Sequence, residues 1–231
     1  MIKQGSAAWH EQRLGKITGS LVHKLMTNAK KKGELSAGAL TYCDDLAGDI
    51  VAGHPVDDDG YNSPAMERGL ELEPIAVGMF ENYMEDLNPS NPVTVKEVGF
   101  IAHPKHSMFG VSLDGKTSDN GILEIKCRGR MAHLKQFRTI DKINREVSVT
   151  AKELLDIAHW QRNWGCYITG ATHSYFVGYT DDLPIDNGGL LVKRFERDEE
   201  LIAQMEEKAM KAAELIPMLA ADYKQLISEL K

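Results

Sequence analysis

The sequence has few cysteines, no long hydrophobic run and fewer basic than acidic residues. Cys43, Cys127 and Cys166 are odd in number and widely spaced, which argues against a disulfide framework and against a thiolate zinc site. No stretch approaches the roughly 20 apolar residues that a bilayer span needs, and residues 1–13 contain no apolar signal-peptide segment. We therefore expect a soluble, cytoplasmic protein without a membrane partner.

The charge is distributed unevenly along the chain. In total, 27 Lys and Arg residues face 34 Asp and Glu residues, which disfavours a nucleic-acid partner because phosphate binding relies on basic side chains. Residues 1–32, however, contain seven basic residues and one acidic residue, and residues 124–145 contain seven and two. Local patches decide binding more than the total does. The two basic segments therefore keep nucleic-acid binding among the candidate functions.

The hydrophobic pattern predicts an alternation of helices and strands. Helices are expected over residues 18–27, 36–52, 64–86, 131–140, 151–169 and about 197–231. Strands are expected over residues 93–101, 108–113, 122–127, 172–179 and 190–195. The second and third of these strands are expected to form a hairpin through residues 114–121, and residues 53–63 a loop; Pro74 allows a helix break near Leu70. Without repeats or linkers, the chain is expected to form one mixed α/β (α+β) domain over residues 1–231.

Two carboxylates and a lysine come together on the predicted hairpin. Side chains alternate along a strand, so Glu124 and Lys126 share one face and Ile125 points to the other. Asp114 ends the partner strand, where pairing brings its carboxylate near Glu124. Two carboxylates and the Ile125 carbonyl form an all-oxygen set that suits Mg²⁺ or Mn²⁺, with Lys126 beside an attacking water. The plain alternative is a half-exposed hairpin whose Glu and Lys face solvent.

Two further polar residues lie on the apolar stripes of predicted helices. Glu73 and Gln161 each belong to a series spaced by three and four residues. The series are Met66, Leu70, Glu73, Val77, Phe80, Met84 and Leu154, Ile157, Gln161, Trp164, Ile168. An inward carboxylate or amide needs a partner, and either residue alone could be a structural hydrogen-bonding group. Together with the hairpin residues they outline a polar pocket.

The pattern of Asp114 followed by Glu124-Ile125-Lys126 resembles the PD-(D/E)XK nuclease superfamily, and within it lambda exonuclease and the YqaJ-type viral recombinases. Further segments carry the likeness: Trp9 to Gly15, Ile17 to Ser20, Gly69 with Glu73, Ser112 to Gly115, Leu123 to Cys127, and Gln161. Leu113 departs from the pattern, because the superfamily name expects proline there. The resemblance implies a restriction-endonuclease-like core, in which helices flank a central mixed β-sheet.

The resemblance also assigns roles to residues. It implies Asp114, Glu124 and the Ile125 carbonyl as metal ligands, Lys126 at the nucleophilic water, and Glu73 and Gln161 as supporting catalytic groups. A DNA 5′-phosphate pocket is implied at Arg13, Ser20 and Ser112. One pocket arginine of the family has no counterpart, because Ala132 stands there; Arg128 or Arg130 is the expected substitute.

The implied activity is metal-dependent, ATP-independent 5′→3′ digestion of one strand of double-stranded DNA from 5′-phosphorylated ends. The 3′ overhangs would serve phage-type recombination with a single-strand annealing protein, in a bacterial or phage-infected cell. The resemblance further implies a ring-shaped homotrimer around DNA. In such a ring, basic segments could line the channel while acidic surface faces outward.

Three alternatives remain at this stage. The first is an endonuclease of the same superfamily that cuts internal or branched sites. The second is a non-catalytic module that binds DNA ends. The third is an NTPase, because residues 110–117 fit the phosphate-loop pattern G-x-x-x-x-G-K-[ST]. That motif requires a helix directly after the loop, whereas the pattern here predicts a turn and a strand, so we interpret the match as accidental.

Overall fold

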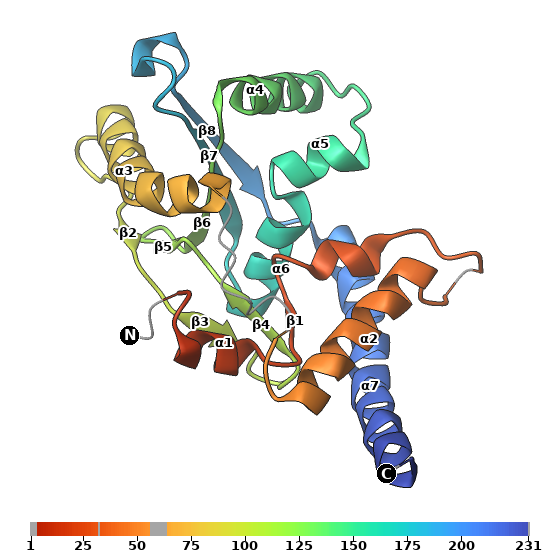
Figure 1. The fold of residues 1–231 in the computed structure, drawn as a ribbon. Helices are drawn as coiled ribbons and strands as arrows, with labels where there is room; N and C mark the ends of the chain where they lie inside the picture. Colours follow the sequence, from red (N-terminus) through yellow and green to blue (C-terminus); the bar gives the residue numbers. More distant parts are fainter. Residues whose placement is uncertain (1–3, 32, 56–63, 231) are drawn as a thin grey trace.

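Two β-sheets form the centre of the computed structural model, which describes residues 4–31, 33–55 and 64–230 (Figure 1). The strands are β1 (Ile17–Thr18), β2 (Val95–Lys96), β3 (Phe100–Ala102), β4 (Phe109–Ser112), β5 (Gly115–Thr117), β6 (Gly121–Cys127), β7 (His173–Tyr179) and β8 (Leu190–Glu196). The larger sheet has the order β2-β5-β6-β7-β8, and the smaller has the order β1-β4-β3. Strand β6 runs parallel to β7 and antiparallel to β5, so it lies in the middle of a mixed sheet.

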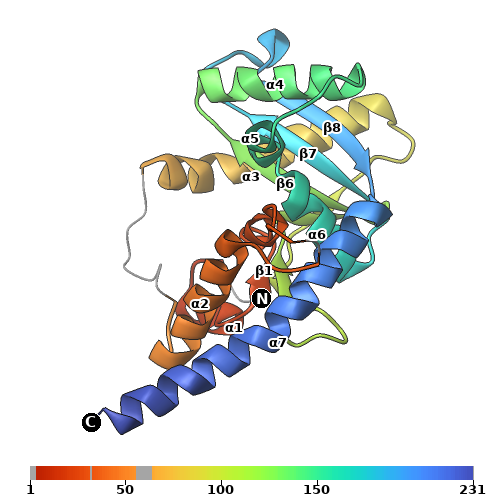
Figure 2. The same cartoon turned by 90° about the vertical axis from the view of Figure 1, so that its right-hand side faces the viewer.

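Helices cover both faces of the larger sheet. They are α1 (Ala7–Arg13), α2 (Ala37–Ala52), α3 (Pro64–Leu87), α4 (Arg130–Asn144), α5 (Ala151–Asp156), α6 (His159–Thr169) and α7 (Glu199–Glu229), with short 3₁₀ turns η1 (Val22–Met26) and η2 (Ile185–Asn187). Helix α3 packs on one face, against β6 and β7, and helices α4 and α6 pack on the other. Helix α2 lies along α7, whose C-terminal end extends away from the sheets (Figure 2).

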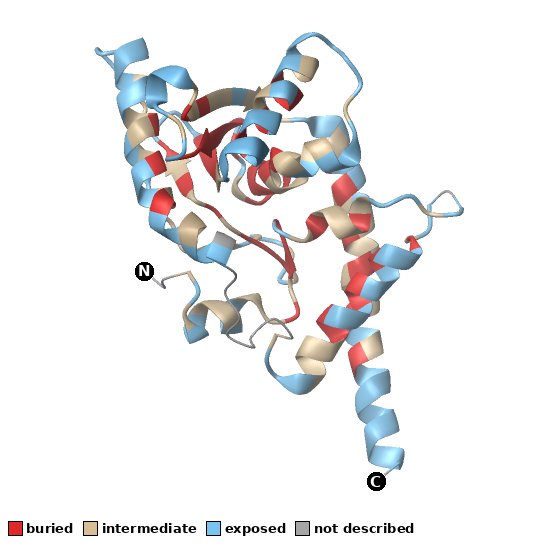
Figure 3. Ribbon diagram, turned by 45° about the horizontal axis from the view of Figure 1, so that its top comes forward, coloured by how far each residue is buried: buried red, intermediate tan, exposed pale blue. Residues whose placement is uncertain are grey.

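The side chains of β6 alternate between two apolar clusters of the core. Leu123 and Ile125 belong to the apolar cluster beneath α3, whereas Ile122 belongs to the cluster that includes Trp164 of α6. Glu124 lies on the same side of the strand as Ile122 and is fully buried. The buried residues concentrate on the sheets and on the α2–α7 contact, while the end of α7 is exposed (Figure 3). A carboxylate is thus placed inside the molecule on an otherwise apolar strand.

The prediction that residues 108–113 form a hairpin with residues 122–127 is wrong. Residues 108–113 yield β4, which pairs with β1 and β3 in the smaller sheet, and it is the short β5 that pairs with β6. The chain leaves one sheet and enters the other at Asp114, between β4 and β5. The predicted strand over residues 93–101 divides in the same way, into β2 in the larger sheet and β3 in the smaller.

Several helix predictions also need correction. Residues 18–27 form the end of β1 and the η1 turn, and α1 was not expected. Helix α3 continues through Pro74, because buried side chains on both sides of the proline, among them Leu72 and Phe80, hold it on the sheet. The helix over residues 151–169 breaks into α5 and α6 at Ala158, whose φ of 53° is left-handed. The loop over residues 53–63 lies mostly outside the described residues.

In the described ranges, no helix is long and apolar enough to cross a membrane.

Candidate active site

Asp114 lies at the crossing between the two sheets and contacts β6 directly. Its Oδ2 accepts a hydrogen bond of 2.6 Å from the backbone N–H of Ile125. In a strand, the N–H and C=O of one residue point to the same edge. The Ile125 carbonyl therefore also faces the Asp114 side, just beyond the point where the pairing of β5 with β6 ends at Leu123. The Asp114 carboxylate and the Ile125 carbonyl therefore lie at the same edge of β6.

Glu124 brings a second carboxylate to the same place. Its Oε1 accepts a hydrogen bond of 2.6 Å from Lys126 Nζ, and its buried Oε2 has no hydrogen-bond partner among the described residues. Burial raises the pKa of Glu124 to about 8, although the neighbouring Lys126 favours the ionised form. Burial also raises the pKa of Asp114. Lys126 is the cation paired with these two crowded, desolvated carboxylates, and Glu124 Oε2 still has no hydrogen-bond partner among the described residues.

Glu73 and Gln161 approach these groups from opposite faces of the sheet. Gln161 of α6 places its Oε1 3.5 Å from Lys126 Nζ. Glu73 of α3 is half-buried, and its pKa is raised to about 7 by burial and then by the charge of Asp114. The structure thus brings together all five residues that the sequence assigned to catalysis. The predicted apolar stripe that contains Glu73 is wrong only for its first two residues, Met66 and Leu70, which are exposed.

The residues fit a divalent cation by the chemistry of their donors. Asp114, Glu124 and the Ile125 carbonyl supply oxygen only, the ligand type that Mg²⁺ and Mn²⁺ prefer. No cluster of three or more His, Cys, Asp or Glu side chains placed to hold a metal occurs in the part of the chain that the structure describes. The predicted set does not require one, because its third ligand is a backbone carbonyl. The unpartnered Glu124 Oε2 is the feature that a cation would satisfy.

A second polar cluster surrounds Arg13, at the end of α1. The guanidinium donates hydrogen bonds to Ser112 Oγ at 3.1 Å, Ser20 Oγ at 3.2 Å and Thr18 Oγ1 at 3.3 Å. Trp9, one helical turn earlier, donates its indole N–H to Ser112 Oγ at 2.9 Å and lies 4.1 Å from the Arg13 guanidinium carbon. An arginine held over an aromatic ring among three hydroxyls is suited to binding phosphate oxygens. Arg13, Ser20 and Ser112, which the family resemblance implied as a 5′-phosphate pocket, therefore lie together.

A cavity of about 400 Å³ lies beside both clusters, because Ser20 of the Arg13 cluster and Lys126 with Gln161 of the carboxylate cluster line it. Its lining consists of Gly19, Ser20, His23, Lys126, Arg128, Leu155, Asp156, Ala158, His159, Trp160 and Gln161. Arg128, one of the two proposed substitutes for the missing arginine, lies in this wall. Arg130 is absent from the lining; it is exposed at the start of α4, where its backbone N–H donates to Asp182 Oδ2 at 3.0 Å. Of the two arginines, Arg128 is therefore the one that lines the cavity.

Sequence reasoning missed Arg162, which lies beside Gln161 on α6. Its side chain is buried, donates to Ser174 Oγ and to the Ile157 carbonyl at 3.0 Å each, and stacks 3.8 Å from the Phe195 ring. Burial lowers its pKa to about 10, and the negative charge of Glu124 opposes this shift. An arginine in a helix normally indicates surface, so the pattern gave no signal for it.

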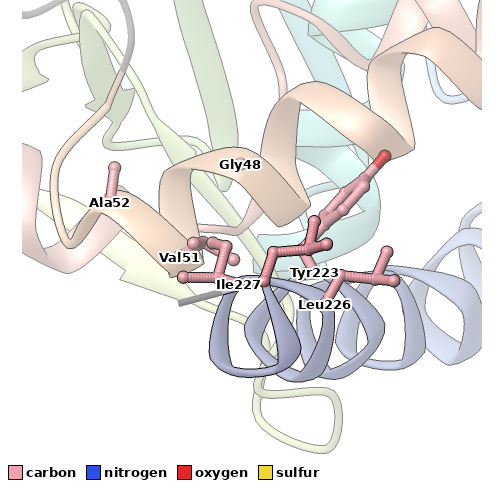
Figure 4. Close-up of a pocket in the computed structure, with 7 residues that line it drawn as sticks. Gly48, Val51, Ala52, Tyr223, Leu226 and Ile227 are labelled. Carbon is pink, nitrogen blue, oxygen red and sulfur yellow. The ribbon is translucent and has the colours of Figure 1, made fainter.

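Another hollow, of about 320 Å³, lies between the ends of α2 and α7 (Figure 4). It is lined by Gly48, Val51, Ala52, Tyr223, Leu226, Ile227 and Leu230. None of these side chains is charged, so this hollow offers nothing for phosphate chemistry. Residues 110–117 are also excluded as a phosphate loop, because β4 and β5 occupy them and no helix follows.

A mixed sheet flanked by helices, with Glu124-x-Lys126 on its central strand and Asp114 just before the neighbouring strand, is the architecture of the PD-(D/E)XK nucleases. The fold class expected from the sequence is therefore confirmed. The YqaJ-like viral recombinase domain matches residues 8–151. The chain belongs to this family, which confirms the resemblance seen in the sequence.

Solved structures of exonucleases share the fold. The chain is 29% identical to the alkaline exonuclease LHK-Exo from Laribacter hongkongensis, with a TM-score of 0.73 over 98% of this chain and 100% of the other. A complex of LHK-Exo with dAMP matches equally well. A phage-related exonuclease from Haemophilus somnus 129PT is 17% identical, with a TM-score of 0.65 over 94% and 96% of the two chains, and shows the fold alone. Among proteins with curated functions, none matches significantly.

Proposed function

We propose that this protein is a metal-dependent, ATP-independent exonuclease that digests one strand of duplex DNA in the 5′→3′ direction from 5′-phosphorylated ends. The observation that carries the proposal is the convergence of Asp114, Glu124 and Lys126 at the open edge of β6, one cavity away from the Arg13 cluster. Family membership and the similarity to LHK-Exo support it.

In this proposal Asp114, Glu124 and the Ile125 carbonyl hold Mg²⁺, or Mn²⁺. The cation supplies Lewis-acid activation of water and charge stabilisation at the phosphate. Although burial lowers it, the charges of Glu124 and Asp114 raise the pKa of Lys126, so this side chain is an ammonium that would orient the attacking water by donating a hydrogen bond to it. Gln161 fixes the Lys126 ammonium through its amide oxygen. Glu73 adds negative charge beside Asp114, which strengthens the attraction for a cation.

In this proposal the Arg13 cluster sets the 5′→3′ direction of digestion. With the 5′-phosphate held by Arg13, Ser20, Ser112 and Arg128, the next phosphodiester is presented to Lys126 across the cavity. Each cut would release a 5′-mononucleotide and lengthen a 3′ overhang for a single-strand annealing protein. A ring-shaped homotrimer in the cytoplasm of a bacterial or phage-infected cell remains part of this proposal.

The test is digestion of linear duplex labelled at each end, in Mg²⁺, with 5′-phosphate or 5′-hydroxyl termini. We expect mononucleotides from the phosphorylated 5′ strand, no product with EDTA, and none from Asp114→Ala. Arg13→Gln should reduce the preference for phosphate over hydroxyl.

Covalently closed circular duplex completes the experiment. Efficient cutting of circles would favour the endonuclease alternative. Binding of ends without any cleavage in either metal would favour the non-catalytic module. Equal rates on phosphate and hydroxyl ends would remove the role of the Arg13 cluster.

A further inference from the structure

The cavity between the Arg13 cluster and Lys126 has an aromatic wall that the phosphate chemistry does not use. The ring centroid of Trp160 lies 6.5 Å from that of His23 and 5.5 Å from that of His159, so three neighbouring rings from η1 and α6 form one wall of the cavity. All three residues line the cavity and are partly exposed. Burial lowers the pKa of His23 and brings that of His159 to about 4, so both rings are neutral near pH 7.

The opposite side of the cavity is polar and basic. It carries Lys126 and Arg128, and Ser20 at the edge shared with the Arg13 cluster. One cavity therefore presents cationic groups for phosphates and a neutral aromatic surface for a flat apolar group. Nucleotides combine these two chemistries, and aromatic side chains bind bases of any sequence by stacking.

The geometry points to a base-binding surface. We propose that His23, Trp160 and His159 contact the base of the 5′-terminal nucleotide while its phosphates occupy the Arg13 cluster and the Lys126 edge. The ring centroids of His23 and Trp160 lie 6.5 Å apart at an interplanar angle of 41°, so the two rings leave no parallel slot into which a base could insert. The base instead packs against the exposed side of this aromatic surface. This inference rests on the proposed function, because it assumes that the cavity receives a DNA end.

The contact should be independent of sequence and should assist separation of the terminal nucleotide from its partner strand. A base bound on Trp160 gives up stacking on its neighbour and gains stacking on protein. It follows that loss of the ring and loss of the base remove the same interaction. Their effects should therefore not add.

The experiment uses duplexes with a 5′-phosphorylated two-nucleotide overhang whose terminal nucleotide is either normal or abasic, so that removal of the base changes no base pair. Affinity is measured by fluorescence anisotropy in EDTA, and first-nucleotide release is measured in Mg²⁺. For the wild type we expect the abasic end to bind about 5- to 150-fold more weakly, the range for one stacked base. Trp160→Leu should bind the normal end as weakly as the abasic end, and Trp160→Phe should keep the discrimination.

The inference is overturned if the wild type binds both ends equally, or if Trp160→Leu weakens both ends by the same factor. If Trp160→Leu fails to fold, His23→Ala and His23→Phe are compared instead on the normal and abasic ends. The first variant removes the aromatic ring and the second keeps one. Because binding is measured without metal, discrimination between the two ends without any cleavage would refute the exonuclease and retain the base surface. Cleavage of the DNA without discrimination between the two ends would support the exonuclease and overturn the base-binding surface.

Discussion

Replacing Glu124 by Gln should stabilise the metal-free protein while abolishing its activity. Glutamine has the shape of the protonated acid, so the substitution removes the cost of ionising a fully buried carboxylate. Burial raises the pKa of Glu124 in the folded protein to about 8, against roughly 4.3 in an unfolded chain. The folded state thus holds this proton more tightly than the unfolded state does.

The sign and window of the effect follow from this pKa. Between about pH 4.5 and pH 8 the folded state binds more protons at this site, so its stability falls as the pH rises. With these two pKa values the penalty is about 4–5 kcal/mol at pH 8 and about 1 kcal/mol at pH 5. Because about 1 kcal/mol shifts the melting temperature of a chain of this size by roughly 2–4 °C, Glu124→Gln should melt roughly 10 °C or more above the wild type at pH 8.

The assay is urea or thermal unfolding in EDTA at pH 5 and pH 8, for the wild type, Glu124→Gln and the control Glu85→Gln. Glu85 is exposed on α3 and its substitution should change little. When Mg²⁺ replaces EDTA, the wild type should become more stable and Glu124→Gln should not change, since a ligand that binds only the folded state raises stability. A variant that is no more stable than the wild type at pH 8, or whose advantage grows toward pH 5, would refute the reasoning.

Three further predictions test neighbouring features. Lys126→Ala should lower the single-turnover rate about 10²- to 10⁴-fold, as expected for loss of the group that positions the attacking water, while affinity for 5′-phosphorylated ends in EDTA changes less than tenfold. An unchanged rate would contradict the role of Lys126. Gly165→Ala should destabilise by about 1–3 kcal/mol in urea unfolding, because the new Cβ lies 2.5 Å from Ile122 Cδ1, whereas Gly48→Ala meets nothing within 4 Å and should not destabilise. His159→Gln should reduce the loss of stability between about pH 6.5 and pH 4, since burial lowers the pKa of His159 to about 4 and unfolding there takes up a proton; an unchanged slope would exclude the buried neutral ring.

The sequence predicted the parts of the site that depend on local pattern. Alternation along one strand placed Glu124 and Lys126 on the same face, and helical spacing turned Gln161 toward them. The pairing of Asp114 was predicted for the wrong reason, because β5 and not β4 is the partner of β6. Its carboxylate still reaches β6, since it lies where the chain enters the larger sheet beside that strand.

The remaining features depend on contacts between distant segments. β1 pairs with β4, some 90 residues later in the chain, and no local periodicity reports such a pairing. The burial of Arg162 rests on Ser174 and Phe195 of two strands that come after it. One missed contact was within reach, because Trp9 and Arg13 are four residues apart and a helix brings such residues together.

The central claim is that Asp114, Glu124 and the Ile125 carbonyl hold one divalent cation, and a crystal soaked in Mn²⁺ tests it most directly through the anomalous signal of the metal. The account predicts one strong peak within about 2.5 Å of an oxygen from each of the three residues, and its loss in Asp114→Ala. A strong peak elsewhere on the molecule with none at this edge of β6 would contradict it.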